Sequence, residues 1–175
     1  DIATFYNMYD NLRGRDIGAP IFSPTPVPRL VVPTAPNTDR SGTTYGVEVA
    51  ADYAVAPWWR LRAAYTFLNT DIDNDVIGSH GSPSHQASLR SLMDLGGGWH
   101  LDLWPRYVDN LPGLGVESYV DLDARLAWRP SDTVEFSVVG QNLLDSRRKE
   151  FMPEFTSLTP TQVERGVYAK ITLTF

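Results

Sequence analysis

Residues 45–67 read YGVEVAADYAVAPWWRLRAAYTF, and this stretch decides the fold because it holds two alternating segments separated by a short connection. In the first segment the odd positions carry mostly apolar side chains, whereas Glu48 and Asp52 occupy even positions. The second segment starts at Trp59 and keeps the same period, with arginines at its first even positions. Successive side chains of a β-strand point to opposite faces, so a period of two is typical of a strand with one apolar face. We therefore predict two antiparallel strands that join at Ala56 and Pro57.

The same alternation recurs along the rest of the chain, between segments rich in Pro, Gly, Asp and Ser. The further strands are predicted at about 2–12, 86–95, 99–107, 120–128, 134–141 and 167–175. Helical periodicity is absent at useful length, and no apolar run approaches the ~18 residues that a transmembrane helix needs. The fold class is therefore predicted to be all-β, with about eight antiparallel strands.

The connections between the predicted strands alternate in length. Short ones lie at 56–57, 96–98 and 129–132, and long ones at about 13–42, 70–84, 110–117 and 145–162. Four of the five tryptophans lie within two residues of a short connection: Trp58, Trp59, Trp99 and Trp128. Amphipathic rings prefer the headgroup level of a membrane, and outer-membrane barrels have short periplasmic turns and longer external loops. We therefore predict an antiparallel transmembrane β-barrel segment whose short turns face the periplasm.

The polar face of the predicted strands carries a dense mixture of opposite charges. It contains Arg60, Arg62, Arg90, Arg106, Arg125, Asp94, Asp102, Asp121 and Asp123. Such a face suits the water-filled interior of a wide barrel, where ion pairs form between neighbouring strands.

Composition argues against several classes of function. The net charge is -6 and no basic stripe is present, which argues against a nucleic-acid partner. Cysteine is absent, so disulfides, thiolate metal sites and cysteine nucleophiles are excluded. Ser146 and Lys149 have the spacing of a Ser-x-x-Lys motif, but its companion motifs are missing and a chance match is favoured. We expect no enzyme activity and no cofactor.

One long connection carries residue types that bind metals. Asp71, Asp73 and Asp75 alternate carboxylates, yet the segment lacks the Gly and the distal Glu of an EF-hand loop. His80 and His85 flank the end of the same loop, and two histidines without a third fixed ligand are weak evidence for a metal. A solvated external loop is therefore favoured, and no metal site is predicted.

Several stretches resemble the barrels of TonB-dependent receptors. They are Tyr45-Gly46-Val47-Glu48, Trp59 to Thr66, Gly140-Gln141-Asn142-Leu143-Leu144-Asp145, Glu150-Phe151, and Glu164 to Tyr168 followed by the terminal Phe175. Their order and spacing carry the resemblance, which spans nearly the whole chain. Members of this family have a barrel of twenty-two strands and an N-terminal plug inside it, together with a short segment that contacts TonB. The resemblance implies that residues 1–175 are the C-terminal portion of the barrel, its last eight strands, and that the plug domain is absent from this chain.

The resemblance also implies a function. Family members are receptors in the outer membrane of Gram-negative bacteria that import scarce nutrients through TonB, and a ferric siderophore is the ligand expected first. The residues expected to line the ligand pathway in the barrel lumen are Arg62, Arg90, Arg106, Asp121, Asp123 and Arg125. External contacts are expected from Asp71, Asp73, Asp75, His80, His85, Arg147 and Arg148, the arginines toward lipopolysaccharide phosphates and solvent.

The last strand has its own expected role. Tyr168, Ile171, Leu173 and Phe175 resemble the signal by which the barrel assembly machinery recognises unfolded outer-membrane proteins. In physical terms this is a strand edge with an apolar face that can add to another sheet. An ordinary closing strand is the alternative, and the two interpretations are compatible.

Two alternatives stay open at this point. One is an autonomous eight-stranded outer-membrane barrel with a structural or adhesion role, although the interior of such a barrel fills with side chains. The other is a soluble lipocalin-like binder or small enzyme. The soluble alternative places Leu61, Leu101, Leu122 and Ile171 in a dry core, whereas the membrane interpretation points them outward to lipid.

Overall fold

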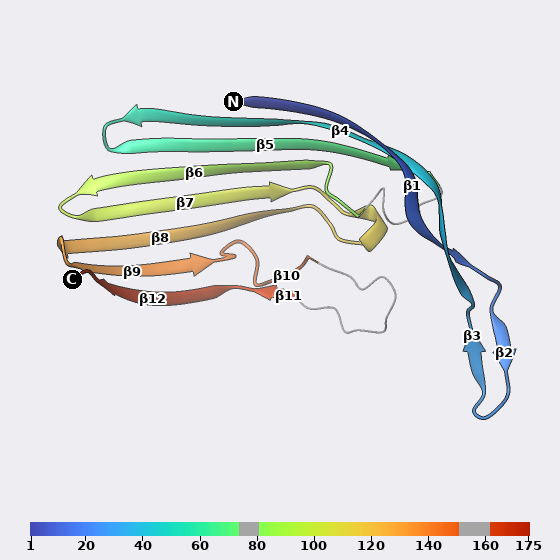
Figure 1. Ribbon diagram of the computed structural model, residues 1–175. Helices are drawn as coiled ribbons and strands as arrows, with labels where there is room; N and C mark the ends of the chain where they lie inside the picture. Colours follow the sequence, from blue (N-terminus) through green and yellow to red (C-terminus); the bar gives the residue numbers. More distant parts are fainter. Residues whose placement is uncertain (74–80, 151–161) are drawn as a thin grey trace.

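The computed structural model describes residues 1–73, 81–150 and 162–175, which form one large antiparallel sheet and two small strand pairs (Figure 1). The large sheet contains eight strands in the order β1-β4-β5-β6-β7-β8-β9-β12. Their bounds are β1 Ile2–Ile17, β4 Thr34–Ala56, β5 Trp59–Ile72, β6 His85–Gly96, β7 Trp99–Val108, β8 Tyr119–Ser131, β9 Val134–Gln141 and β12 Gly166–Leu173. This arrangement confirms the predicted all-β fold class and the eight antiparallel strands.

The sheet is open, with β1 at one edge and β12 at the other. Each of these two strands pairs with one neighbour only, β1 with β4 and β12 with β9. The eight described strands therefore do not close on one another. This geometry contradicts an autonomous eight-stranded barrel and fits one wall of a wider barrel.

Two predicted loops contain additional strands. Within 13–42 the pairing of β1 with β4 continues out to Ile17 opposite Thr34, and the hairpin of β2 (Ile21–Ser23) and β3 (Arg29–Val31) extends from it (Figure 1). Within 145–162, β10 (Arg147–Lys149) begins a second pair that β11 (Gln162–Glu164) completes. The residues of β2, β3 and β11 are mostly exposed, so these extensions lack the alternation of a strand with one buried face. The 110–117 connection contains a short 3-10 helix, η2, at Pro112–Leu114, enclosed by a bridge between Leu111 and Val116.

The two faces of the sheet differ in the way that the alternation predicts. Large apolar side chains on one face are exposed, for example Leu126 at 44%, Val138 at 51% and Ile171 at 63%. Among the described residues the only buried apolar side chains are Val116 and Ala127, and the largest fully buried side chain is that of Asp121. A soluble binder would bury its apolar face in a dry core, so this distribution contradicts the lipocalin-like alternative.

The short turns lie together at one end of the sheet and the long connections at the other (Figure 1). At the short-turn end Trp99 and Trp128 stack at 5.9 Å between ring centroids, and Trp128 stacks on Phe136 at 5.9 Å. Trp59 belongs to the same end, where its indole N–H donates a hydrogen bond to Ser91 Oγ at 2.9 Å. Aromatic side chains thus lie at this end of the sheet on β5, β7, β8 and β9. Within the described ranges no helix is long and apolar enough to cross a membrane.

Candidate functional site on the polar face

The polar face carries a series of ion pairs that extends across β4 to β9. On β4 and β5, Asp52 lies 3.4 Å from Arg60 Nε and 3.0 Å from Arg62 Nε. Arg62 lies opposite Asp52 in the strand register and opposite Arg90 on β6. The side chains of Asp52, Arg60 and Arg62 are about half exposed, so their ion pairs contribute little to stability and leave charge open to solvent.

Two carboxylates join the arginines in the middle of the face. Asp102 on β7 lies 3.9 Å from Arg90 and 3.4 Å from Arg125. Glu135 on β9 pairs with Arg125 through one oxygen and with Arg129 through the other, the latter at 2.9 Å. Each of Asp102, Arg125 and Glu135 has two partners, so alternating charges connect four strands.

Arg106 holds two carboxylates near the end of the sheet with the long connections. Its Nη2 donates to Asp121 Oδ2 and, at 2.9 Å, to Asp123 Oδ2. The same guanidinium lies 4.4 Å from the ring centroid of Trp104, which also belongs to the polar face, and Arg90 approaches that ring at 5.9 Å. Trp104 is 39% exposed, so one aromatic surface flanked by arginines is open toward the interior side of the sheet.

The chain leaves the sheet at Asn142, where the backbone has a positive φ of 52°. Asn142 N–H donates to Asp123 Oδ1 at 3.0 Å, and its side-chain amide donates to the carbonyl of Val163 at 3.2 Å. Its Oδ1 accepts a hydrogen bond of 2.9 Å from Arg148 Nη1. Asparagine tolerates the left-handed conformation, which lets one residue end β9 and contact both the wall and β11.

Arg148 completes this cluster from β10. Its side chain is only 8% exposed, and it pairs with Glu150 and, at 3.4 Å, with Asp121 Oδ1. The guanidinium also lies 4.0 Å from the ring centroid of Tyr119. Burial opposes the charge, but hydrogen bonds to Glu150 and the nearby carboxylate of Asp121 hold the pKa of the Arg148 guanidinium above its ordinary value. This is a correction to the expectation that Arg148 faces lipopolysaccharide and solvent, because its donors are directed back to the wall.

The other residues expected outside the membrane are distributed differently. Asp71 lies within β5 rather than in a loop, and Asp73 accepts a hydrogen bond of 2.5 Å from Ser41 Oγ. His85 is the first residue of β6, and its Nδ1 is 2.8 Å from the hydroxyl of Tyr65. Arg147 is exposed and pairs with Glu164 at 3.2 Å. The remaining two expected residues, Asp75 and His80, lie outside the described residues.

The terminal strand is the free edge of the sheet. Tyr168, Ile171 and Leu173 lie in β12 at 49%, 63% and 56% exposure. Phe175 follows the strand and is fully exposed. Tyr168 lies opposite Val139 and Ile171 opposite Phe136, so these two residues occupy opposite faces. The outer edge of β12 thus presents unpaired backbone groups beside an apolar face.

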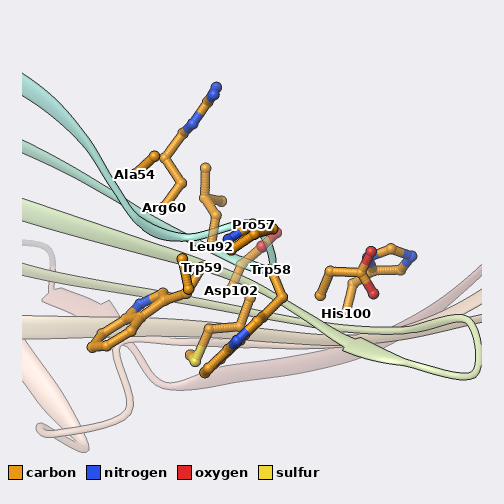
Figure 2. A pocket seen from close by; sticks show the side chains of 11 residues that line it. Ala54, Pro57, Trp58, Trp59, Arg60, Leu92, His100 and Asp102 are labelled. Atoms are coloured by element: carbon orange, nitrogen blue, oxygen red, sulfur yellow. The ribbon is translucent and has the colours of Figure 1, made fainter.

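A shallow hollow of about 400 Å³ lies where the β4–β5 turn meets β6 and β7. Its lining includes Trp58, Arg60, Asp94, His100 and Asp102. Figure 2 shows Arg60 on one side of the strands and the rings of Trp58 and Trp59 on the other. Both faces of the sheet therefore contribute side chains to this hollow. Within the described residues, no group of three His, Cys, Asp or Glu side chains is arranged to hold a metal ion.

Sequence patterns and the structure agree on most of this face. The alternation alone places Trp104 and Glu135 on the charged side, so the face that each occupies can be predicted from the sequence. Asn142, Asp52 and Glu150 emerge as partners only from the folded arrangement. The geometry is that of a sheet with one exposed apolar face and one paired, charged face, the class of structure found in outer-membrane barrels.

Comparison with known proteins places the chain more closely. Residues 1–143 match the family described as "TonB dependent receptor-like, beta-barrel". The chain belongs to this TonB-dependent receptor family, whose members are outer-membrane proteins of Gram-negative bacteria. No match is found among curated proteins.

Solved structures of the same fold include three receptors. The pyoverdine outer membrane receptor FpvA from Pseudomonas aeruginosa PAO1, bound to pyoverdine, is 17% identical and superposes with a TM-score of 0.73, over 99% of this chain and 27% of that one. The ferric yersiniabactin uptake receptor FyuA from Yersinia pestis is 15% identical, with a TM-score of 0.66 over 98% and 37%. The ferric-catecholate import receptor Fiu from E. coli K12, open form, is 19% identical, with a TM-score of 0.62 over 76% and 21%. The chain thus spans between about a fifth and somewhat over a third of the length of these structures.

Proposed function

We propose that this chain is the C-terminal wall of an outer-membrane receptor that imports a scarce nutrient through TonB, with a ferric siderophore as ligand. The single observation that carries the proposal is the paired charged face between Asp52 and Glu135, opposite an exposed apolar face. A wall with one lipid face and one charged aqueous face serves passage of a polar solute across a membrane. The family supports the same function.

The roles of individual residues follow from this placement. Arg62 and Arg90 are about half exposed on the charged face, so they contact an anionic solute at little cost. Arg106 and Arg125 are each shared between two carboxylates and mainly keep the wall in register. Ferric siderophores combine oxygen-rich anionic groups with a compact shape, which suits exposed arginines beside the open ring of Trp104.

Two further partners belong to this proposal. The exposed apolar side chains of the outer face contact membrane lipid, and the free edge at β12, with Tyr168, Ile171, Leu173 and Phe175, is the signal for the barrel assembly machinery. TonB acts through the plug region of the complete receptor. Arg147, exposed on β10, is the residue in this part of the chain that meets lipopolysaccharide phosphates.

Uptake by the complete receptor tests the proposal. A strain that lacks the gene is supplied with wild-type receptor, and accumulation of radioactive iron is measured from catecholate, hydroxamate and mixed ferric siderophores, with and without TonB. The proposal predicts TonB-dependent accumulation from at least one of them. Accumulation of cobalamin or a carbohydrate in place of iron would show that the ligand is not a ferric siderophore. Accumulation that does not depend on TonB would contradict the mechanism.

A further inference from the structure

The external segment that follows β9 packs one buried charged side chain against the wall. After Asn142 the chain leaves the sheet, and among the described residues β10 pairs with β11 alone, through Arg147, Arg148 and Lys149. Arg147 and Lys149 are exposed. Arg148 lies between them and points back to the wall, where its side chain is 8% exposed.

The partners of Arg148 come from three different parts of the chain. Asp121 belongs to the wall strand β8, Asn142 ends β9, and Glu150 follows β10. Tyr119, at the start of β8, places its ring 4.0 Å from the guanidinium. A planar guanidinium with five donors makes several directed contacts at once, which a flexible ammonium group does not reproduce.

We infer that Arg148 is a positioning residue, which fixes the external strands β10 and β11 in one orientation relative to the barrel wall. The effect of this positioning on ligand binding rests on the proposed function. The two strands border a surface hollow of about 750 Å³ at the external end of β8. Glu117, Tyr119, Arg147 and Lys149 line that hollow. Fixing β10 therefore fixes the exposed cations Arg147 and Lys149 beside the entrance to the lumen.

Asp121 connects this anchor with the lumen. Its Oδ2 accepts from Arg106, and its Oδ1 lies 3.4 Å from Arg148. Asp121 is 2% exposed, so water does not readily take the place of either arginine beside its carboxylate. The external strands and the charged lumen face thus share one buried carboxylate.

A neighbouring arginine provides a matched control. Arg147 occupies the same strand and also pairs with a glutamate, but its side chain is 67% exposed and its partner Glu164 lies in β11. Removing Arg147 weakens the contact between β10 and β11. Removing Arg148 takes away the buried contacts with Asp121 and Asn142 that hold β10 against the wall.

The test measures a distance in the complete receptor, reconstituted in lipid vesicles. Spin labels are attached at Lys149→Cys on β10 and Asp132→Cys in the β8–β9 turn, and pulsed electron resonance gives the distribution of distances between them. This part of the chain contains no native cysteine. The same distribution is recorded in Arg148→Gln, Arg148→Lys, Asp121→Asn and Arg147→Gln backgrounds, each checked for a folded barrel by heat-modifiable migration in gels.

A narrow distribution is expected for the wild type and for Arg147→Gln. A broad distribution is expected for Arg148→Gln and Asp121→Asn. Arg148→Lys should give a distribution of intermediate width, because lysine keeps the charge but lacks the planar guanidinium. Affinity for the ferric siderophore that the wild type takes up is expected to fall about five- to tenfold in Arg148→Gln.

An unchanged distribution in folded Arg148→Gln would overturn the inference, as would equal broadening in Arg147→Gln. If Arg148→Gln does not fold, the comparison of Arg148→Lys with Arg147→Gln decides in the same way. The distance measurement needs neither ligand nor TonB, so it stands if the receptor transports something else. Failure of uptake with every ferric siderophore would overturn the proposed function and leave the positioning role intact.

Discussion

Trp99 and Trp128 lie directly opposite each other on β7 and β8, and their rings stack at 5.9 Å between centroids on the apolar face. They sit at the short-turn end, the level at which outer-membrane barrels carry a belt of aromatic side chains. Rings at a membrane interface combine burial of an apolar surface with a polar edge near the headgroups. We therefore expect this pair to lie at one boundary of the membrane, on the outer surface of the sheet.

Replacement of Trp128 by alanine tests the belt. Trp128 stacks on both Trp99 and Phe136, and each ring pair contributes about 0.5–1.5 kcal/mol beyond its buried area. We expect Trp128→Ala to lower the free energy of unfolding in lipid vesicles by about 1–3 kcal/mol, measured by urea titration. Val138→Ala, on the same face without a ring contact, is the control and should cost less. Equal losses would show that the stacking contributes nothing.

Replacement of turn glycines tests the β6–β7 connection. Gly96 and Gly98 both have φ of 79°, so a side chain strains either position. A Cβ on Gly98 would also lie 2.3 Å from the carbonyl oxygen of Arg129, whereas nothing lies within 4 Å at Gly96. Gly96→Ala should cost about 1–2 kcal/mol and Gly98→Ala clearly more, in the same unfolding assay. A smaller loss at Gly98 would contradict the turn geometry.

Glu135 should contribute more to stability than Arg129, the more exposed of the two arginines that it pairs with. Glu135→Gln leaves Arg125 and Arg129 without their shared carboxylate, and the expected loss of stability is about 1–3 kcal/mol. Arg129 is 52% exposed, so Arg129→Gln should cost under about 1 kcal/mol. Unfolding of both single variants and the double variant gives the coupling energy. Additive losses would mean that the two groups do not interact.

Arg90 offers the cleanest test of the ligand pathway. Its nearest carboxylate oxygen, on Asp102, is 3.9 Å away and its side chain is 46% exposed, so substitution should leave the barrel folded. Arg90→Glu is expected to reduce uptake of an anionic ferric siderophore by about tenfold or more, because the local field changes sign. Arg90→Lys should retain most of the uptake. Normal uptake in folded Arg90→Glu would remove Arg90 from the pathway.

The alternation of side chains made the strands and their faces predictable. From Val120 to Trp128 successive side chains point to opposite faces of the sheet, and the difference between the apolar face and the charged face imposes the period of two on the sequence. The charged residues of the lumen face follow directly, since they occupy the opposite positions. Ion pairs such as Arg106 with Asp121 then follow from the register of antiparallel neighbours.

The external parts were less predictable, for a physical reason. β2, β3, β10 and β11 have no apolar face to bury, so their sequences carry no alternation. The burial of Arg148 depends on Asp121, 27 positions earlier, and on the reversal of the chain at Asn142. Composition indicates only a charged loop at that place.

The central claim is that one face of the sheet meets lipid and the other meets water. It is tested most directly by attaching a spin label at each position from 120 to 128 of β8 in the complete receptor in vesicles. Collision rates with oxygen, which concentrates in lipid, are compared with those of a water-soluble nickel complex. The account predicts a period of two, with oxygen favoured at even positions such as Leu122 and Leu126 and nickel or protein contact at odd ones such as Asp123. Oxygen collisions that are equal at both sets of positions, or highest at Asp123, would contradict it.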